Sequence, residues 1–229
     1  MKTLNVGLLG FGTVGAGVAR LFIDSADRIR ARLGIDLNLK YVADIDLETD
    51  RGVPLEDGVL IPDARRVVAD PEVDVVLEMI GGEGIAKELI LEAIDSGKAV
   101  VTANKALLAK HGAQIFQAAE DRGVDLAFEA SVGGCMPVIK SLRESLVGNR
   151  INAMSGILNG TCNYILSRIT EEGLSFKAAL AQAQEAATLL GRPLVVAAFG
   201  DTRPAVQQQP EANFARRTVL ALYAQGIPL

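Results

Sequence analysis

Three glycines near the N-terminus have the spacing that a dinucleotide-binding loop requires. Gly10, Gly12 and Gly15 in GLLGFGTVG form a G-x-G-x-x-G pattern directly after an apolar run. Between a strand and a helix, such glycines permit a tight turn, a close approach of the backbone to a diphosphate and close helix packing, while the helix N–H groups face the anion. A glycine turn with only a structural role is the alternative. We predict that a dinucleotide contacts the loop at Gly10, Phe11, Gly12, Thr13, Val14 and Gly15.

A carboxylate follows the next apolar run. Asp44 comes directly after LNLKYVA, where the acid of a dinucleotide fold accepts hydrogen bonds from the adenosine ribose. This position favours NAD, although Asp44 lies further along the chain than the usual spacing of about 20 residues. Arg51 follows closely and suits a 2′-phosphate, so the residues alone leave the choice between NAD and NADP open. A solvated loop acid is the other interpretation of Asp44.

A lysine follows a later apolar run and is the candidate for proton transfer. Lys105 lies in TANK, after AVV, and is therefore predicted at the carboxyl edge of a sheet. Ligands of open α/β folds bind at that edge, where a lysine can contact polar groups and relay a proton. The alternative is a solvated lysine at the start of a helix, where a cation is disfavoured unless an anion lies nearby.

Short apolar runs alternate with longer amphipathic ones through the first half of the chain. Strands are predicted at 4–9, 37–43, 73–80, 99–104 and 124–130, and helices at 14–33, 85–96 and 106–122. This alternation implies right-handed crossovers and a parallel sheet covered on both faces. We predict an α/β fold whose residues 1–130 form a Rossmann-type doubly wound parallel sheet.

The character of the sequence changes after Ser131. The glycine-rich loop VGGCMP precedes a predicted helix at 138–146, a strand at 151–158 and helices at 162–171 and 176–187. We predict that residues 131–229 form a second, incomplete α/β domain for substrate binding and dimerisation. Its tail becomes atypical from about residue 186.

Composition excludes several classes of partner. The chain has 229 residues, 49% apolar and 22% charged, with a net charge of −5. A negative charge argues against nucleic acid or an anionic membrane surface as the partner. Cys135, Cys162 and His111 are the only cysteines and histidine, which supports neither a zinc site nor a disulfide framework. Without a signal peptide or a long apolar run, we expect a cytoplasmic protein that acts on a small molecule.

Four segments resemble the homoserine dehydrogenase family over about residues 1–185. They are the glycine loop, VVTANKALLA, FEASVGGCMPVIKSLRESL and GILNGTCNYIL. The resemblance implies a homodimer that interconverts L-aspartate 4-semialdehyde and L-homoserine with NAD(P), in threonine, methionine and isoleucine biosynthesis. It also implies that Thr102, Asn104 and Lys105 contribute to the cofactor site, with Lys105 catalytic.

The resemblance implies two further sites. A sodium-type monovalent cation is expected at Glu129, Val132, Gly134 and Met136, through the acid and main-chain oxygens. From the residues alone, a cap or an ion pair explains Glu129 equally well. Asn159, Gly160 and Thr161 are expected to bind the amino-acid end of the substrate, and a plain N-cap is the alternative for Thr161.

The tail departs from the family pattern. The family has an acid and a second lysine downstream, and ungapped extension places Leu190 and Ala205 at those positions. No lysine follows Lys177, and a looser alignment offers Arg217, which cannot donate a proton as lysine does. We therefore expect impaired turnover, consistent with a frame change or truncation. The alternatives are a non-catalytic or truncated dinucleotide-binding homologue and a dehydrogenase that uses Asp201 and Arg203.

Overall fold

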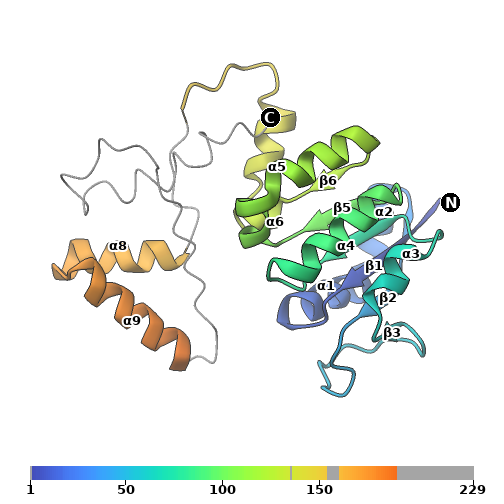
Figure 1. The fold of residues 1–229 in the computed structure, drawn as a ribbon, viewed down its shortest axis with the longest axis horizontal. Coiled ribbons are helices and arrows are strands. Elements are labelled where there is room, and N and C mark those ends of the chain that lie inside the picture. The colour runs from blue at the N-terminus through green and yellow to red at the C-terminus, as the bar shows by residue number, and fades with distance from the viewer. Residues whose placement is uncertain (1, 135, 154–159, 190–229) are drawn as a thin grey trace. The chain divides into compact units, whose positions relative to one another are not determined.

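The computed structural model describes residues 2–134, 136–153 and 160–189. Within the chain, two compact units comprise residues 1–139 and 140–229. The first unit holds the sheet and most of the helices (Figure 1). No helix in the described ranges is long and apolar enough to span a bilayer.

Six parallel strands build the sheet of the first unit. They are β1 (Thr3–Leu9), β2 (Asp36–Ala43), β3 (Leu60–Ile61), β4 (Val75–Glu78), β5 (Ala99–Thr102) and β6 (Leu126–Ala127). Their order is β3-β2-β1-β4-β5-β6, and every pair is parallel. This is the order of a doubly wound dinucleotide fold, and its direction reverses between β1 and β4. The predicted fold class is confirmed.

Helices connect the strands. They are α1 (Thr13–Asp24), α2 (Ala26–Leu33), α3 (Ala64–Ala69), α4 (Gly84–Asp95), α5 (Lys105–Arg122) and α6 (Glu129–Val132). The single helix predicted at 14–33 is two helices, because Ser25 takes a non-helical conformation and ends α1 as it begins α2. Gly34, with φ of 71°, ends α2 at the predicted position.

Both faces of the sheet are apolar and covered. Leu9 and Val76 pack in a cluster that includes residues of α3, α4 and α5. Leu8 and Leu77, their neighbours in sequence, pack on the other face with residues of α1. Alternate residues of a strand point to opposite faces, so this division shows helices on both sides of the parallel strands.

The predicted strand at 124–130 is wrong over most of its length. Only Leu126 and Ala127 pair with β5, and Glu129 begins α6 instead of ending a strand. The backbone of this edge segment bonds locally, with Ser131 N–H donating to Phe128 O and Gly133 N–H to Glu129 O. Local helical bonding therefore replaces the sheet ladder.

The remaining elements begin at the boundary between the units. They are α7 (Val138–Lys140), a π-helical turn (Ser141–Ser145), α8 (Gly160–Glu172) and α9 (Phe176–Leu189). In the second unit α8 and α9 pack through a small apolar cluster centred on Ile165, Ala179 and Ala183. Most of the strand predicted at 151–158 and the whole tail from 190 lie outside the described residues.

Candidate dinucleotide site

The glycine loop connects β1 to α1 at the carboxyl edge of the sheet. Gly10 has φ of 93°, and a Cβ there would lie 2.8 Å from backbone atoms of Met79 and Ile80. At Gly15 a Cβ would lie 1.9 Å from Gly10 O, so the helix and the loop touch without room for a side chain. Gly12 is different, because a Cβ there would have no neighbour within 4 Å. The loop is therefore closed behind Gly10 and Gly15 and open at Gly12.

The N-terminus of α1 offers hydrogen-bond donors. Gly12 is its N-cap and has no side chain, so no side-chain bond caps the helix. The first N–H groups of a helix lack intrahelical partners and attract anions. Thr13 and Val14 are exposed at this position, beside the open side of Gly12. This arrangement fits a diphosphate held by backbone amides.

Asp44 lies directly after β2 and is bonded to the glycine loop. Its Oδ2 accepts from Phe11 N–H at 2.5 Å, and its Oδ1 accepts from Asp46 N–H at 2.9 Å. A carboxylate oxygen can accept more than one hydrogen bond, so both oxygens can also accept from a ribose hydroxyl. Asp44 is half-buried and thus reachable from the same edge.

Arg51 is held by its neighbours. Its Nη2 lies 3.0 Å from Asp46 Oδ2, and its guanidinium carbon lies 5.3 Å from the centre of the Phe11 ring. Hydrogen bonding from Thr49 lowers the pKa of Asp46 to about 2, and the Arg51 charge adds to this effect. Asp46 therefore stays ionised at neutral pH and pairs with Arg51.

Four buried polar side chains meet at the ends of β4 and β5. Glu78 is fully buried, and its Oε1 accepts from Ile80 N–H and Gly81 N–H at 3.0 and 3.1 Å. Its Oε2 accepts from the Thr102 hydroxyl at 2.6 Å. We call the set Glu78, Thr102, Asn104 and Ser131 the buried polar cluster.

The cluster ties three connections together. Asn104 N–H donates to Thr102 Oγ1 at 3.0 Å, and Asn104 Nδ2 donates to Gly82 O at 2.7 Å. The Ser131 hydroxyl donates to Thr102 O at 2.7 Å, which links α6 to β5. One hydrogen-bond network therefore holds the loop after β4, the start of α5 and helix α6.

Lys105 is the first residue of α5 and lies beside this network. Asn104 caps the helix by accepting from Leu107 N–H at 3.1 Å. Lys105 is half-buried at the carboxyl edge of the sheet. Across the described part of the chain, neither a hydrogen bond nor an ion pair engages its ammonium group. The ammonium is thus available to a ligand at this edge.

The expected cation residues lie along α6 and the loop after it. Glu129 Oε1 accepts from Ile139 N–H at 2.8 Å, and Met136 O accepts from Val138 N–H at 2.8 Å. Val132 ends α6, and Gly134 is exposed. The described ranges contain no cluster of three His, Cys, Asp or Glu residues suited to a metal. One carboxylate with carbonyl oxygens remains a donor set for a hard cation.

The expected substrate residues belong to the second unit. Asn159 lies outside the described residues, and Gly160 and Thr161 open α8. The tail positions Leu190, Asp201, Arg203, Ala205 and Arg217 also lie outside them.

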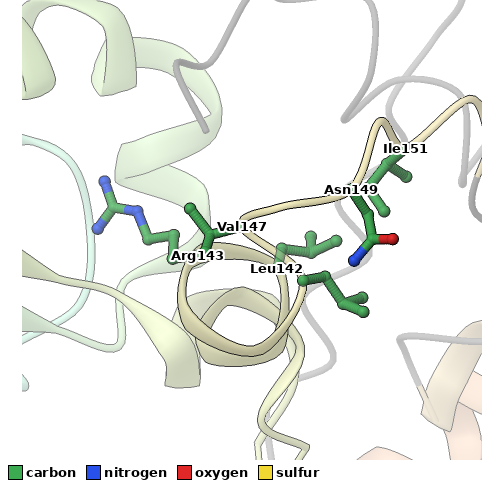
Figure 2. Close-up of a pocket in the computed structure, with 6 residues that line it drawn as sticks. Leu142, Arg143, Val147, Asn149 and Ile151 are labelled. Carbon is green, nitrogen blue, oxygen red and sulfur yellow. The ribbon is translucent and has the colours of Figure 1, made fainter.

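A hollow of about 350 Å³ occurs in the second unit (Figure 2). Its lining is Leu142, Arg143, Leu146, Val147, Asn149 and Ile151. Figure 2 shows the Arg143 guanidinium pointing away from Asn149 and Ile151. The predicted site residues do not line this hollow, and its side chains carry no carboxylate or lysine.

Comparison with known proteins decides the family. Residues 10–129 match the NAD binding domain of homoserine dehydrogenase, and residues 137–189 match the homoserine dehydrogenase domain. The chain belongs to the homoserine dehydrogenase family. The first of these matches contains the glycine loop, Asp44 and Lys105, and the second contains Gly160 and Thr161. Val132, Gly134 and Met136 lie between the two.

Alignments with individual members of the homoserine dehydrogenase family show how much of each relative's length this chain covers. The enzyme of Neisseria gonorrhoeae is 47% identical over 184 residues, which are 80% of this chain and 42% of that protein. The enzyme of Pseudomonas aeruginosa is 42% identical over all of this chain and 50% of its own length. The crystal structure of a homoserine dehydrogenase from Thiobacillus denitrificans, 41% identical, matches with a TM-score of 0.75 over all of this chain and 50% of that one. The chain spans about half the length of these relatives.

Sequence reasoning missed two members of the buried polar cluster. Glu78 interrupts the apolar run VDVVLEMI just before Gly81 and Gly82, and Ser131 follows Glu129 by two residues. A lone carboxylate in a strand buried on both faces requires several hydrogen-bond donors. That requirement was the available signal for Glu78, whereas nothing in the sequence distinguishes Ser131.

Proposed function

We propose that this chain takes part in the NAD(P)-dependent interconversion of L-aspartate 4-semialdehyde and L-homoserine. One observation carries the proposal: the uncapped N-terminus of α1 and the unengaged Lys105 ammonium lie at the same edge of one sheet. The first suits the diphosphate of the cofactor, and the second suits a carbonyl that gains negative charge. Membership in the homoserine dehydrogenase family supports this choice of substrate.

Within this proposal the cofactor is NAD in preference to NADP. Asp44 accepts hydrogen bonds where the adenosine ribose is expected, and its charge opposes a 2′-phosphate. Arg51 is the nearby cation, but Asp46 neutralises it at 3.0 Å. A 2′-phosphate would therefore lie beside the negative charge of Asp44, while the positive charge of Arg51 is already balanced by Asp46.

The residues of the chain have distinct roles in the proposed reaction. When bound, NAD(P) supplies or accepts the hydride. Lys105 stabilises the substrate oxygen and exchanges a proton with it, while Asn104 fixes the start of α5 beneath it. Thr102 acts indirectly, because its hydroxyl is bonded to Glu78 and its carbonyl to Ser131. Asn159, Gly160 and Thr161 bind the amino-acid end of the substrate.

Two further features belong to the proposal. A sodium-type cation is held by the Glu129 carboxylate and the main-chain oxygens of Val132, Gly134 and Met136, as the donor chemistry allows. The active assembly is a homodimer formed through the domain that follows residue 130.

The test uses the full chain and a matched pair of lysine variants. NADH and NADPH are titrated by fluorescence, and oxidation is then followed after addition of L-aspartate 4-semialdehyde. Lys105→Met should lower the rate of oxidation at least about 100-fold, a larger effect than on NADH binding, whereas Lys110→Met, on the same helix but paired with Glu83 at the surface, should leave both unchanged. Failure to bind either dinucleotide would refute the proposal.

A second candidate is a dinucleotide-binding homologue without turnover. The residues Leu190 and Ala205 favour it, since they stand where ungapped extension of the family pattern places an acid and a second lysine. The same assay separates the two candidates. Tight NADH binding without oxidation in the wild type selects the second one.

A further inference from the structure

Glu78 is a buried acid that has no assigned part in the proposed reaction. Its side chain has no exposed surface, and it lies in a strand whose neighbours Val76 and Leu77 are core residues. Burying a carboxylate is costly unless hydrogen bonds satisfy it. An apolar residue at this position would pack against the same core, so the carboxylate must be explained by its partners.

Those partners are all hydrogen-bond donors at the carboxyl edge. Ile80 N–H, Gly81 N–H and the Thr102 hydroxyl point at the two Glu78 oxygens within 3.1 Å. In the described ranges no ion pair links Glu78 to a cation. Gly81 and Gly82 both have positive φ, near 75°, so the chain turns sharply here and cannot satisfy these N–H groups through a regular ladder. The carboxylate therefore fixes the shape of this turn.

The same side chain controls the start of α5 through Thr102. The Thr102 hydroxyl donates to Glu78 and accepts from Asn104 N–H, so its orientation is defined at both ends. Asn104 in turn bonds to Gly82 O at 2.7 Å, which closes the network back onto the turn after β4. Lys105 follows Asn104 directly. Its position thus depends on the Glu78 carboxylate through two short hydrogen-bonded steps.

This turn lies where the nicotinamide half of a dinucleotide is expected. β4 is the neighbour of β1 across the point where strand order reverses, and dinucleotides lie across that point. With the diphosphate at the glycine loop and the adenosine at Asp44 after β2, the other half of the cofactor extends over the ends of β4 and β5. We propose that Glu78 is a positioning residue that holds the turn at 80–82 and the Asn104–Lys105 segment in place for the nicotinamide half of the cofactor. This inference rests on the proposed function.

The chemistry of Glu78→Gln defines the main test. The glutamine keeps one oxygen for Ile80 N–H and Gly81 N–H but presents an NH₂ group to Thr102. The Thr102 hydroxyl then accepts instead of donating, and its own proton loses its acceptor. A second pair isolates the same link: Thr102→Val removes the hydroxyl, and Thr102→Ser retains it as the matched control.

Two ligands separate the halves of the cofactor. NADH contains the nicotinamide, and ADP-ribose has the same adenosine and diphosphate without it. In calorimetric titrations of the full chain, Glu78→Gln and Thr102→Val should weaken NADH binding by about tenfold, because binding must then also order the turn that this hydrogen bond to a charged group held in place. ADP-ribose binding should change less than about twofold, because its contacts do not involve this network, and Thr102→Ser should resemble the wild type.

Amide hydrogen exchange in the protein without cofactor gives an independent measurement. Thr102→Val should accelerate exchange at Asn104 and leave Gly15 and Ala16 in α1 unchanged. If both ligands weaken equally in the variants, or if neither weakens, Glu78 is not a positioning residue for the nicotinamide half. If Glu78→Gln does not fold, the Thr102 pair decides the matter alone. A wild type that binds neither ligand refutes the proposed function itself and, with it, this inference.

Discussion

Three glycines in the same loop and helix should respond to alanine in three different ways. At Gly12 a new Cβ meets no atom within 4 Å, at Gly15 it lies 1.9 Å from Gly10 O, and at Gly17 it again meets nothing. All three have negative φ, so alanine is allowed by the backbone at each. The contacts alone therefore decide the outcomes.

The magnitudes follow from these distances. Gly15→Ala forces a carbon into a backbone oxygen that cannot rotate away, which should cost at least about 3 kcal/mol and lower Tm by roughly 6–12 °C. Gly17→Ala should stabilise the protein by about 0.5–1 kcal/mol, since it removes a helix-interior glycine without a clash. Gly12→Ala should change stability by less than about 0.5 kcal/mol. It should nevertheless weaken NADH binding at least tenfold, because the methyl group would stand on the open side of the loop, where we propose that the diphosphate binds.

Thermal unfolding of the full chain measures the first effects, and fluorescence titration with NADH measures the last. Gly17→Ala is the control for both, because it lies one turn into α1 and away from the diphosphate. NADH binding by Gly12→Ala at wild-type strength would show that the diphosphate does not lie against this loop. A wild-type Tm for Gly15→Ala would show that the helix and the loop are not in the contact described here.

Three further variants test the charged groups. Lys105→Met should lower kcat with L-aspartate 4-semialdehyde by at least about 100-fold in steady-state assays, because it removes the proposed proton-transfer group. Asp46→Asn should shift the ratio of NADPH to NADH dissociation constants about fivefold toward NADPH, because it releases Arg51 from its pair. A hydrogen bond from Lys40 holds the pKa of Asp70 down at about 2. That contribution to stability is complete above the unfolded pKa near 4 and is lost as pH falls through the folded one, so the gap between wild type and Asp70→Asn in urea unfolding should stay constant above about pH 5 and close between about pH 4 and 2.

Much of the N-terminal unit could be predicted because its signals are local. The glycine spacing after an apolar run predicts the β1–α1 connection, and the alternation of apolar runs predicts the parallel sheet. Gly34 and Gly123 end helices in the left-handed conformation, as glycine after a periodic segment indicates. Each of these features depends on residues within one turn or one strand.

The features that sequence reasoning missed depend on contacts between distant residues. Glu78 meets Thr102, and Thr102 meets Ser131, only because β4 and β5 are adjacent and α6 folds over their ends. The same cause explains the error at Glu129. Its segment looks extended in sequence, but an edge position with one strand neighbour leaves its backbone to bond helically. The short α3 was also missed, although Asp63 caps it by accepting from Arg65 N–H.

At the two edges of the sheet, side chains of opposite charge bond to the backbone groups, and this difference explains where an anion can bind. At the amino edge the buried Lys98 ammonium donates to the carbonyls of Asp70 and Val73. At the carboxyl edge the connections expose N–H groups instead, and Glu78 accepts two of them after β4 while Asn104 caps α5. After β1 the Asp44 carboxylate accepts from Phe11 N–H, but the helix that follows has no side-chain cap, because Gly12 is the N-cap of α1. Backbone N–H groups are thus satisfied after β4 and at the start of α5, whereas those at the start of α1 are left open. A dinucleotide would therefore place its diphosphate at the glycine loop and its nicotinamide half over a turn that the protein already fixes.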